Sequence, residues 1–275
     1  MRMGQHEGPL VSVLMGVLYR RENVNLLERS IRSIQDQTYS NWELLICDDG
    51  STKASRQYIE NIAIRDGRIH PIRGCPKMDL ASKLNWCLKA AKGMYIARMD
   101  DDDWSDPQRF EKQLCVLKDK PAIAFVGSNV RLWRENRVVG IRDLPKNPEI
   151  RDFLFVQPFI HPAMMFRIEP LLAVGGYFED RHCMKCEDYD LLLRLYGAGF
   201  RGENLQERLL DYTIPSTAKG SRTMGDRWNE AVTRYRRFRG LGLLPGAWPY
   251  VAKPILVGIL PEKIFACLKR TGTGG

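Results

Sequence analysis

The sequence has no hydrophobic run long enough to cross a membrane. A spanning helix needs roughly 20 consecutive apolar residues, and the most apolar stretch, residues 241–260, is broken by prolines and a lysine. Residues 1–9 are polar and contain no apolar signal region. We therefore expect a cytoplasmic protein that reaches the inner face of the cell membrane only by peripheral attachment.

The cysteines form no disulfide framework, because their number is odd and most of them lie in apolar segments. This usage is typical of a reduced, intracellular chain. Cys183 and Cys186 have the spacing of metal ligands beside His182, but a zinc site needs a second pair and the sequence has none at suitable spacing. We interpret these cysteines as structural or incidental.

Acidic residues are fewer than basic ones, which gives the chain a net charge of +9 at pH 7. This balance favours an anionic partner: nucleotide phosphates, nucleic acid or an acidic membrane surface. Basic residues gather in residues 234–239, and an apolar and basic tail follows to residue 270. That composition suits a helix on an anionic membrane; the alternative is a helical pair packed on the rest of the chain. Removal of residues 241–275 should release a membrane-bound protein.

Apolar segments alternate with amphipathic ones in the first half of the chain, which predicts a parallel sheet covered by helices on both faces. The expected strands are residues 11–17, 42–47, 68–72 and 95–99, and the expected helices are 24–34, 54–65 and 80–91. The second half is less regular. There we expect strands at 123–126, 164–166 and 208–212, and helices at 188–196 and 224–239.

Two of the expected strands end in aspartates, at Asp48-Asp49 and at Asp100 to Asp103. Ligands of such sheets bind beyond the carboxyl ends of the strands, so these carboxylates are expected at one rim. Mg²⁺ and Mn²⁺ prefer oxygen ligands of this kind. The alternative for Asp100 to Asp103 is a solvated acidic turn before a helix that starts at Pro107, and the alternative for Asp48-Asp49 is an ordinary turn and helix cap.

A third acidic pair, Glu187-Asp188, opens an expected helix. Acidic residues suit a helix N-terminus, so capping is one interpretation; the other is a general base that accepts a proton from a hydroxyl. His161 precedes an apolar strand, and a lone histidine in such a place is more often structural than a ligand.

Taken in order, these segments resemble glycosyltransferase family 2 over roughly residues 10 to 200. The motifs that carry the resemblance are Val11-Ser-Val-Leu-Met15, residues 33–39, Glu43 to Thr52, Leu84-Asn85, residues 91–103, 161–167, 175–177 and 187–194. The resemblance implies a GT-A fold, that is, an α/β fold with a Rossmann-like, mostly parallel central sheet flanked by helices. It also implies inverting transfer of a sugar from a nucleotide-diphosphate sugar to a hydroxyl.

On this resemblance, residues 1–9 are an N-terminal tail and residues 10–215 are the catalytic domain. Its nucleotide-binding half is 10–105 and its acceptor-binding half is 106–215. Residues 216–275 form a C-terminal helical extension.

The resemblance also assigns roles to single residues. Asp188 is the expected base with Glu187 beside it, Asp102 and Asp100 are the expected ligands of Mn²⁺ or Mg²⁺, and Asp103 is expected to start the next turn. The nucleotide sugar is expected to contact Asp48, Asp49, Lys83, Asp100 and Asp101, with Arg222 near its pyrophosphate and His161 as a further candidate.

The expected acceptor is a saccharide or a lipid-linked saccharide, as in the building of cell-surface polysaccharide. Processive synthases carry a Gln-x-x-Arg-Trp motif, whereas this chain has Met224 ahead of Arg227-Trp228, so addition of single sugars is expected. Two rival hypotheses are a nucleotide-sugar-binding module without turnover and a nucleic-acid-binding protein. Nucleic acid is not expected, because it leaves the acidic rim unexplained.

Overall fold

The computed structural model describes residues 8–18, 24–72, 79–214 and 222–259. Its strands form a single sheet in the order β3-β2-β1-β4-β8-β6-β9-β5, with β7 paired to β6. The strands are β1 (Val11–Val17), β2 (Trp42–Asp48), β3 (Ile69–Ile72), β4 (Tyr95–Arg98), β5 (Trp104–Ser105), β6 (Phe125–Arg134), β7 (Arg137–Arg142), β8 (Met165–Arg167) and β9 (Gly202–Thr213).

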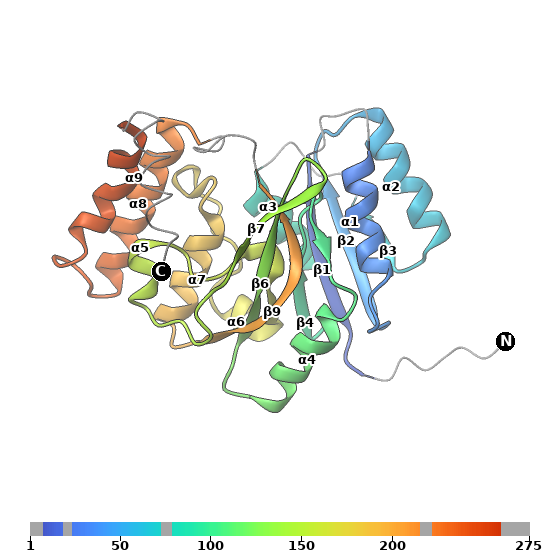
Figure 1. The fold of residues 1–275 in the computed structure, drawn as a ribbon, viewed down its shortest axis with the longest axis horizontal. Helices are drawn as coiled ribbons and strands as arrows, with labels where there is room; N and C mark the ends of the chain where they lie inside the picture. The colour runs from blue at the N-terminus through green and yellow to red at the C-terminus, as the bar shows by residue number, and fades with distance from the viewer. Residues whose placement is uncertain (1–7, 19–23, 73–78, 215–221, 260–275) are drawn as a thin grey trace.

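Helices lie on both faces of this sheet (Figure 1). They are α1 (Asn25–Gln35), α2 (Lys53–Arg65), α3 (Leu80–Ala90), α4 (Arg109–Asp119), α5 (Asp152–Phe155), α6 (Ile168–Ala173), α7 (Glu187–Gly197), α8 (Met224–Gly240) and α9 (Trp248–Ile259), with 3-10 turns η1 (His161–Ala163) and η2 (Arg181–Cys183). None of the helices in these described ranges is both long and apolar enough to cross a membrane.

The first half of the sheet is parallel, as predicted. Both β2 and β4 run parallel to β1, with Val11 opposite Trp42 on one side and opposite Tyr95 on the other. The two strands that end in aspartates therefore deliver them to the same edge. Beyond β4 the sheet is mixed, because β8 runs antiparallel between β4 and β6, while β9 is parallel to β6.

Side chains of β1 and β2 alternate between two hydrophobic cores, one on each face of the sheet. Val13 belongs to the core that contains residues of α1 and α4, and Leu14 to the core that contains residues of α3 and α7. This alternation is the two-residue period of a strand. Both faces are apolar because both are covered, which is why the strands are continuous hydrophobic runs in the sequence.

Helix α8 packs on α7, and α9 packs on α8, at the end of the molecule opposite α1 and α2 (Figure 1). Phe238, Ala247 and Val251 are buried in the same core as α7, and the rings of Tyr235 and Trp248 are 5.5 Å apart. A deletion of residues 241–275 would therefore uncover this core, so it is a poor test of membrane attachment. The outer side of α9 stays exposed.

Three expected elements have different bounds in the structure. The strand expected at 123–126 runs on to Arg134 and turns into β7 through Glu135 and Asn136, both at positive φ, as a tight hairpin requires. The end of β6 and the whole of β7 were not predicted, because they are partly exposed and polar residues interrupt their apolar ones. Pro107 precedes the first turn of α4, which begins at Arg109. The strand expected at 208–212 begins earlier, at Gly202.

Candidate active site

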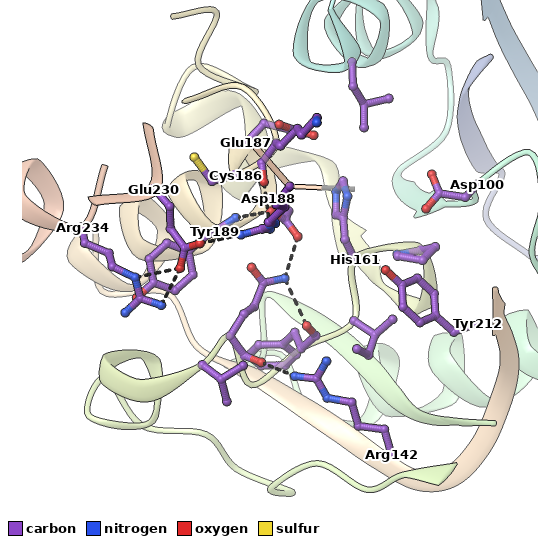
Figure 2. A pocket seen from close by; sticks show the side chains of 18 residues that line it. Asp100, Arg142, His161, Cys186, Glu187, Asp188, Tyr189, Tyr212, Glu230 and Arg234 are labelled. Carbon is purple, nitrogen blue, oxygen red and sulfur yellow. Dashed lines mark hydrogen bonds and ion pairs between the residues drawn. The ribbon is translucent and has the colours of Figure 1, made fainter. Parts of the chain in front are cut away.

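A pocket of about 410 Å³ lies at the N-terminal end of α7, a volume typical of small-ligand sites. Five of the predicted site residues line it: Asp100, His161, Glu187, Asp188 and Arg222. Figure 2 shows Asp188 near the centre, with Asp100 on the side of the strand edge. The pocket thus joins the end of β4 to the start of α7, two segments far apart in sequence.

The Asp188 carboxylate is held by two hydrogen bonds. One oxygen accepts from the backbone N–H of Tyr189 at 2.7 Å, and the other accepts from the Gln157 side-chain amide at 2.9 Å. Gln157 is itself fixed by a bond to the carbonyl of Phe159 at 3.1 Å. Burial of the carboxyl raises the pKa of Asp188, and the Gln157 hydrogen bond opposes that shift. A carboxylate fixed in this way keeps lone pairs for a further proton.

Glu187 stands next to it and is also buried. Burial, and then repulsion from the Asp188 charge, raise the pKa of Glu187 to about 7. Two neighbouring carboxyls that hold protons more tightly than usual mark a site suited to proton transfer.

The aspartate run is tied to the fold at both ends. The Asp100 carboxylate pairs with the fully buried Arg98, and its carbonyl accepts from the Ser30 hydroxyl at 2.7 Å. Burial and the charge of Asp100 raise the pKa of Asp101 to about 6. Thr213, at the end of β9, donates its hydroxyl to the Asp102 carbonyl at 2.6 Å.

The expectation that Asp103 only starts the next turn is wrong. Asp103 is fully buried, and one of its oxygens accepts from the backbone N–H of Thr213 at 2.7 Å. Burial, and then repulsion from Asp100 and Asp102, raise the pKa of Asp103 well above that of a free aspartate. Asp103 therefore anchors the loop, and leaves Asp100, Asp101 and Asp102 nearer the surface.

The described part of the chain contains no group of three His, Cys, Asp or Glu side chains placed to hold a metal ion. Asp100 and Asp102 offer oxygen donors only, which fits Mg²⁺ or Mn²⁺ better than zinc. Mg²⁺ commonly takes one or two carboxylates and completes its shell with substrate phosphates and water. The residues present fit such an ion once a diphosphate supplies the remaining oxygens.

The predicted nucleotide contacts at the end of β2 do not line this pocket. Asp49 pairs with Lys83 at 2.7 Å, and their side chains are 1% and 4% exposed. Lys83 also donates to the carbonyl of Val17 at 3.0 Å. One oxygen of Asp48 accepts from the backbone N–H of Ser51 at 2.9 Å, so the turn interpretation holds for Asp48. The same sheet edge carries Asp49 and Asp100.

Two further candidates have partners of their own. His161 is buried and hydrogen-bonded to the Tyr177 hydroxyl at 2.9 Å, and burial lowers the pKa of His161 well below its usual value. It is therefore a neutral, fixed ring at neutral pH. Arg222 pairs with Glu230 and donates to the carbonyl of Lys185 at 3.0 Å. It lines the pocket from the α8 side.

Cys183 and Cys186 are buried and free, and both lie near the hydroxyl of Thr233. Burial raises the pKa of the Cys183 thiol to about 11, which disfavours the nucleophilic thiolate at neutral pH.

Sequence reasoning missed several residues that line the pocket: Arg142, Gln157, Glu230, Arg234 and Tyr212. Nothing in the sequence marked Gln157 or Arg142 as a site residue, because only tertiary structure brings them near Asp188.

The sheet and its aspartate-bearing edge define the class of the protein: it has the GT-A glycosyltransferase fold. The mannosyltransferase PcManGT from Pyrobaculum calidifontis, solved in complex with GDP-Man and Mn²⁺, superposes with a TM-score of 0.60 at 17% identity, covering 96% of this chain and 79% of that one.

The chain belongs to glycosyl transferase family 2, whose model matches residues 16–170. It is 37% identical over 260 residues to EpsE of Bacillus subtilis, covering 94% of this chain and 92% of EpsE. It is also 35% identical over 215 residues to the O-antigen biosynthesis glycosyltransferase WbnJ of Escherichia coli, covering 74% of this chain and 80% of WbnJ. The protein is therefore a glycosyltransferase.

Proposed function

We propose that this glycosyltransferase moves a sugar, with inversion, from a nucleotide-diphosphate sugar to a hydroxyl of a saccharide or lipid-linked saccharide that becomes cell-surface polysaccharide. The observation that carries the proposal is the Asp188 carboxylate, fixed by Gln157 and lying in one pocket with Asp100 of the aspartate run. The name of WbnJ, an O-antigen biosynthesis enzyme, supports the polysaccharide acceptor.

In this proposal Asp188 is the base. The acceptor hydroxyl lies against the free lone pairs of the carboxylate and gives up its proton as it attacks the sugar. Gln157 keeps the carboxylate in one orientation, which lowers the cost of ordering the reacting groups. Attack from the Asp188 side, with the nucleotide leaving on the Asp100 side, inverts the anomeric centre. The transition state has oxocarbenium character, by analogy with glycoside hydrolysis.

Asp102 and Asp100 would hold Mn²⁺ or Mg²⁺ together with the donor diphosphate. The ion, when bound, neutralises charge that develops on the leaving nucleotide. On the same proposal Asp49, with Asp48 beside it, contacts the base, Asp101 contacts the ribose, and Lys83 holds Asp49 in place. Arg222 supports the pyrophosphate from α8.

The test is a hydrolysis screen of nucleotide sugars with Mn²⁺ or Mg²⁺, because transferases commonly hydrolyse their own donor slowly when no acceptor is present. We expect one donor to be hydrolysed well above background, and its hydrolysis to stop on chelation. If no donor in a panel of uridine, guanosine and thymidine diphosphate sugars is hydrolysed or bound, the proposal is wrong.

The acidic pair predicts a pH dependence. A base works only when it is deprotonated, and the pKa of Glu187 is raised to about 7 while that of Asp188 is also raised. We expect kcat/KM to fall as the pH drops, and to begin to fall above the pH range in which an ordinary carboxyl titrates. A profile of kcat/KM against pH measures this, and a flat profile down to about pH 5 would contradict it.

The free energy of unfolding should respond in the opposite direction. Because the folded pair binds protons more tightly than the unfolded chain does, its contribution to stability is greatest at low pH and is lost as the pH rises through about 7. Denaturant unfolding of the wild type and of Glu187→Gln, at pH 5.5 and pH 8, separates this effect from the activity profile. The stability gained by Glu187→Gln should be larger at pH 8.

We also propose that the exposed side of α9 attaches the enzyme to an anionic membrane. Leu256 and Ile259 are 59% and 70% exposed there, and the net charge of the chain is +9. We expect the double substitution Leu256→Ser and Ile259→Ser to weaken binding to phosphatidylglycerol vesicles at least about tenfold. Sedimentation with vesicles measures this.

The matched control is Leu172→Ser. Leu172 on α6 is 58% exposed, so this variant loses a similarly exposed apolar side chain at another place on the surface. Equal losses for both variants, or no binding by the wild type, would count against a membrane-facing α9.

A further inference from the structure

The cations that line the pocket differ in one respect. Lys185 pairs with Asp226 at 2.8 Å, Arg234 pairs with Glu230 at 2.9 Å, and Arg222 also pairs with Glu230. Arg142 has no carboxylate within ion-pair distance anywhere in the described ranges, and its hydrogen bond goes to the neutral carbonyl of Gln157, at 3.1 Å. The pocket therefore contains one arginine that forms no ion pair with the described residues, because the Asp188 charge acts on it only from beyond ion-pair distance.

Arg142 is not simply a surface residue with water around it. It is half-buried, and burial lowers the pKa of its guanidinium, although arginine remains charged at any physiological pH. A guanidinium carries five N–H donors, and a buried charge without an ion-pair partner is costly. An anion in the pocket would supply the missing partner.

The position of Arg142 is well fixed. It is the last residue of β7, opposite Val130 in the ladder with β6. Figure 2 shows it on the same side of the pocket as Tyr212, away from Glu230 and Arg234. A site on a strand holds its geometry better than one on a loop.

Arg142 and the base candidate share one support. Arg142 donates to the backbone carbonyl of Gln157, and the side chain of Gln157 donates to Asp188. A group bound at Arg142 is thereby placed relative to Asp188, where the acceptor hydroxyl is expected. The donor diphosphate is expected at the aspartate run instead; in Figure 2, Asp100 of that run lies beyond Tyr212 as seen from Arg142.

We propose that Arg142 binds an anionic group of the acceptor, either the carboxylate of an acidic sugar or the phosphoryl group of a lipid carrier. The proposal rests on the function proposed above, because it assumes that the acceptor occupies this pocket. Both groups match the planar donor fork of a guanidinium, which forms paired hydrogen bonds with carboxylate and phosphate oxygens. An anionic acceptor would be preferred over a neutral one of the same shape.

The experiment measures that preference by ligand-observed NMR, with Mg²⁺ and saturating UDP or GDP filling the donor site. The carboxylate arm compares methyl glucuronoside with methyl glucoside, and the phosphate arm compares citronellyl phosphate with citronellol. We expect the anionic member of one pair to bind at least about tenfold more tightly, in line with a charge-assisted hydrogen bond. The arm that responds identifies the chemical source of the anion.

Arg142→Gln should reduce that ratio to near one. The control Arg137→Gln, at the exposed start of the same strand, should leave it unchanged. Arg142→Lys keeps the positive charge but lacks the planar guanidinium, so it should give an intermediate ratio. This variant tests the proposal if Arg142→Gln does not fold. A wild type that shows no preference in either arm, or an Arg142→Gln that folds and keeps the preference, overturns the proposal.

These outcomes are separable from failure of the proposed function. If neither UDP nor GDP binds and no donor is hydrolysed, the glycosyl donor site itself is wrong. If a nucleoside diphosphate binds and neither anionic probe is preferred, only the role of Arg142 is wrong.

Discussion

Substitution of Asp188 by Asn should abolish sugar transfer while the protein stays folded. General base catalysis contributes on the order of 10²- to 10⁴-fold to a rate, so kcat should fall by at least about 100-fold. Asn has the same shape and still accepts the hydrogen bond from the Tyr189 N–H, but it cannot take up the acceptor proton. Steady-state transfer with the donor found in the hydrolysis screen measures the loss.

The helix-capping interpretation of Asp188 predicts a different result, so a control is needed. Glu169 is an exposed acid in the first turn of α6, and Glu169→Gln loses the same favourable interaction with a helix N-terminus, about 0.3–1 kcal/mol. Transfer should be unchanged in that variant. Wild-type activity of a correctly folded Asp188→Asn would show that the carboxylate only caps α7.

Gln157 explains why this site could be predicted only in part. The sequence places Asp48, Asp49 and Asp100 at one sheet edge, because parallel strands and their ends can be recognised from hydrophobic runs. It places Glu187 and Asp188 at a helix start for similar reasons. The sequence does not show how far Asp188 lies from Asp100. That distance depends on how β8 and β6 add to the sheet and on the path of the chain between β7 and η1. Arg142 and Gln157 lie at the start and near the end of that path.

Asp103 illustrates a second limit. Within four consecutive aspartates, the sequence alone does not say which side chains face solvent. The backbone path into β5 buries Asp103 against Thr213, and that contact depends on a strand about a hundred residues away. The run therefore divides into an anchor and a more exposed part, a division that comes from tertiary pairing and not from local preference.

Substitution of Asp102 by Asn should remove metal-dependent transfer. Chelation of wild-type enzyme should stop turnover, and Mn²⁺ or Mg²⁺ should restore it. In Asp102→Asn we expect transfer to fall on the order of 100-fold or more, because the variant lacks one of the two carboxylates expected to hold the ion, and the other, Asp100, also pairs with Arg98. Transfer measured across a metal titration tests this.

The variant Asp106→Asn is the matched control, because Asp106 follows the run closely and its side chain accepts only from the nearby Gln108 N–H among the bonds that the structure shows. It should keep wild-type metal dependence. Asp103→Ala should differ from both: it removes the oxygen that accepts from the Thr213 N–H, so it should lower the unfolding temperature at least as clearly as it lowers transfer.

Metal affinity itself should depend on the nucleotide. Since no three acidic, histidine or cysteine side chains in the described ranges are placed to hold an ion, the protein alone offers an incomplete shell, and Mn²⁺ should bind weakly to it. A nucleoside diphosphate adds phosphate oxygens, so Mn²⁺ titrated by electron paramagnetic resonance should bind much more tightly with UDP or GDP present. Asp102→Asn should lose most of that gain, whereas equally tight Mn²⁺ binding by both proteins would place the ion elsewhere.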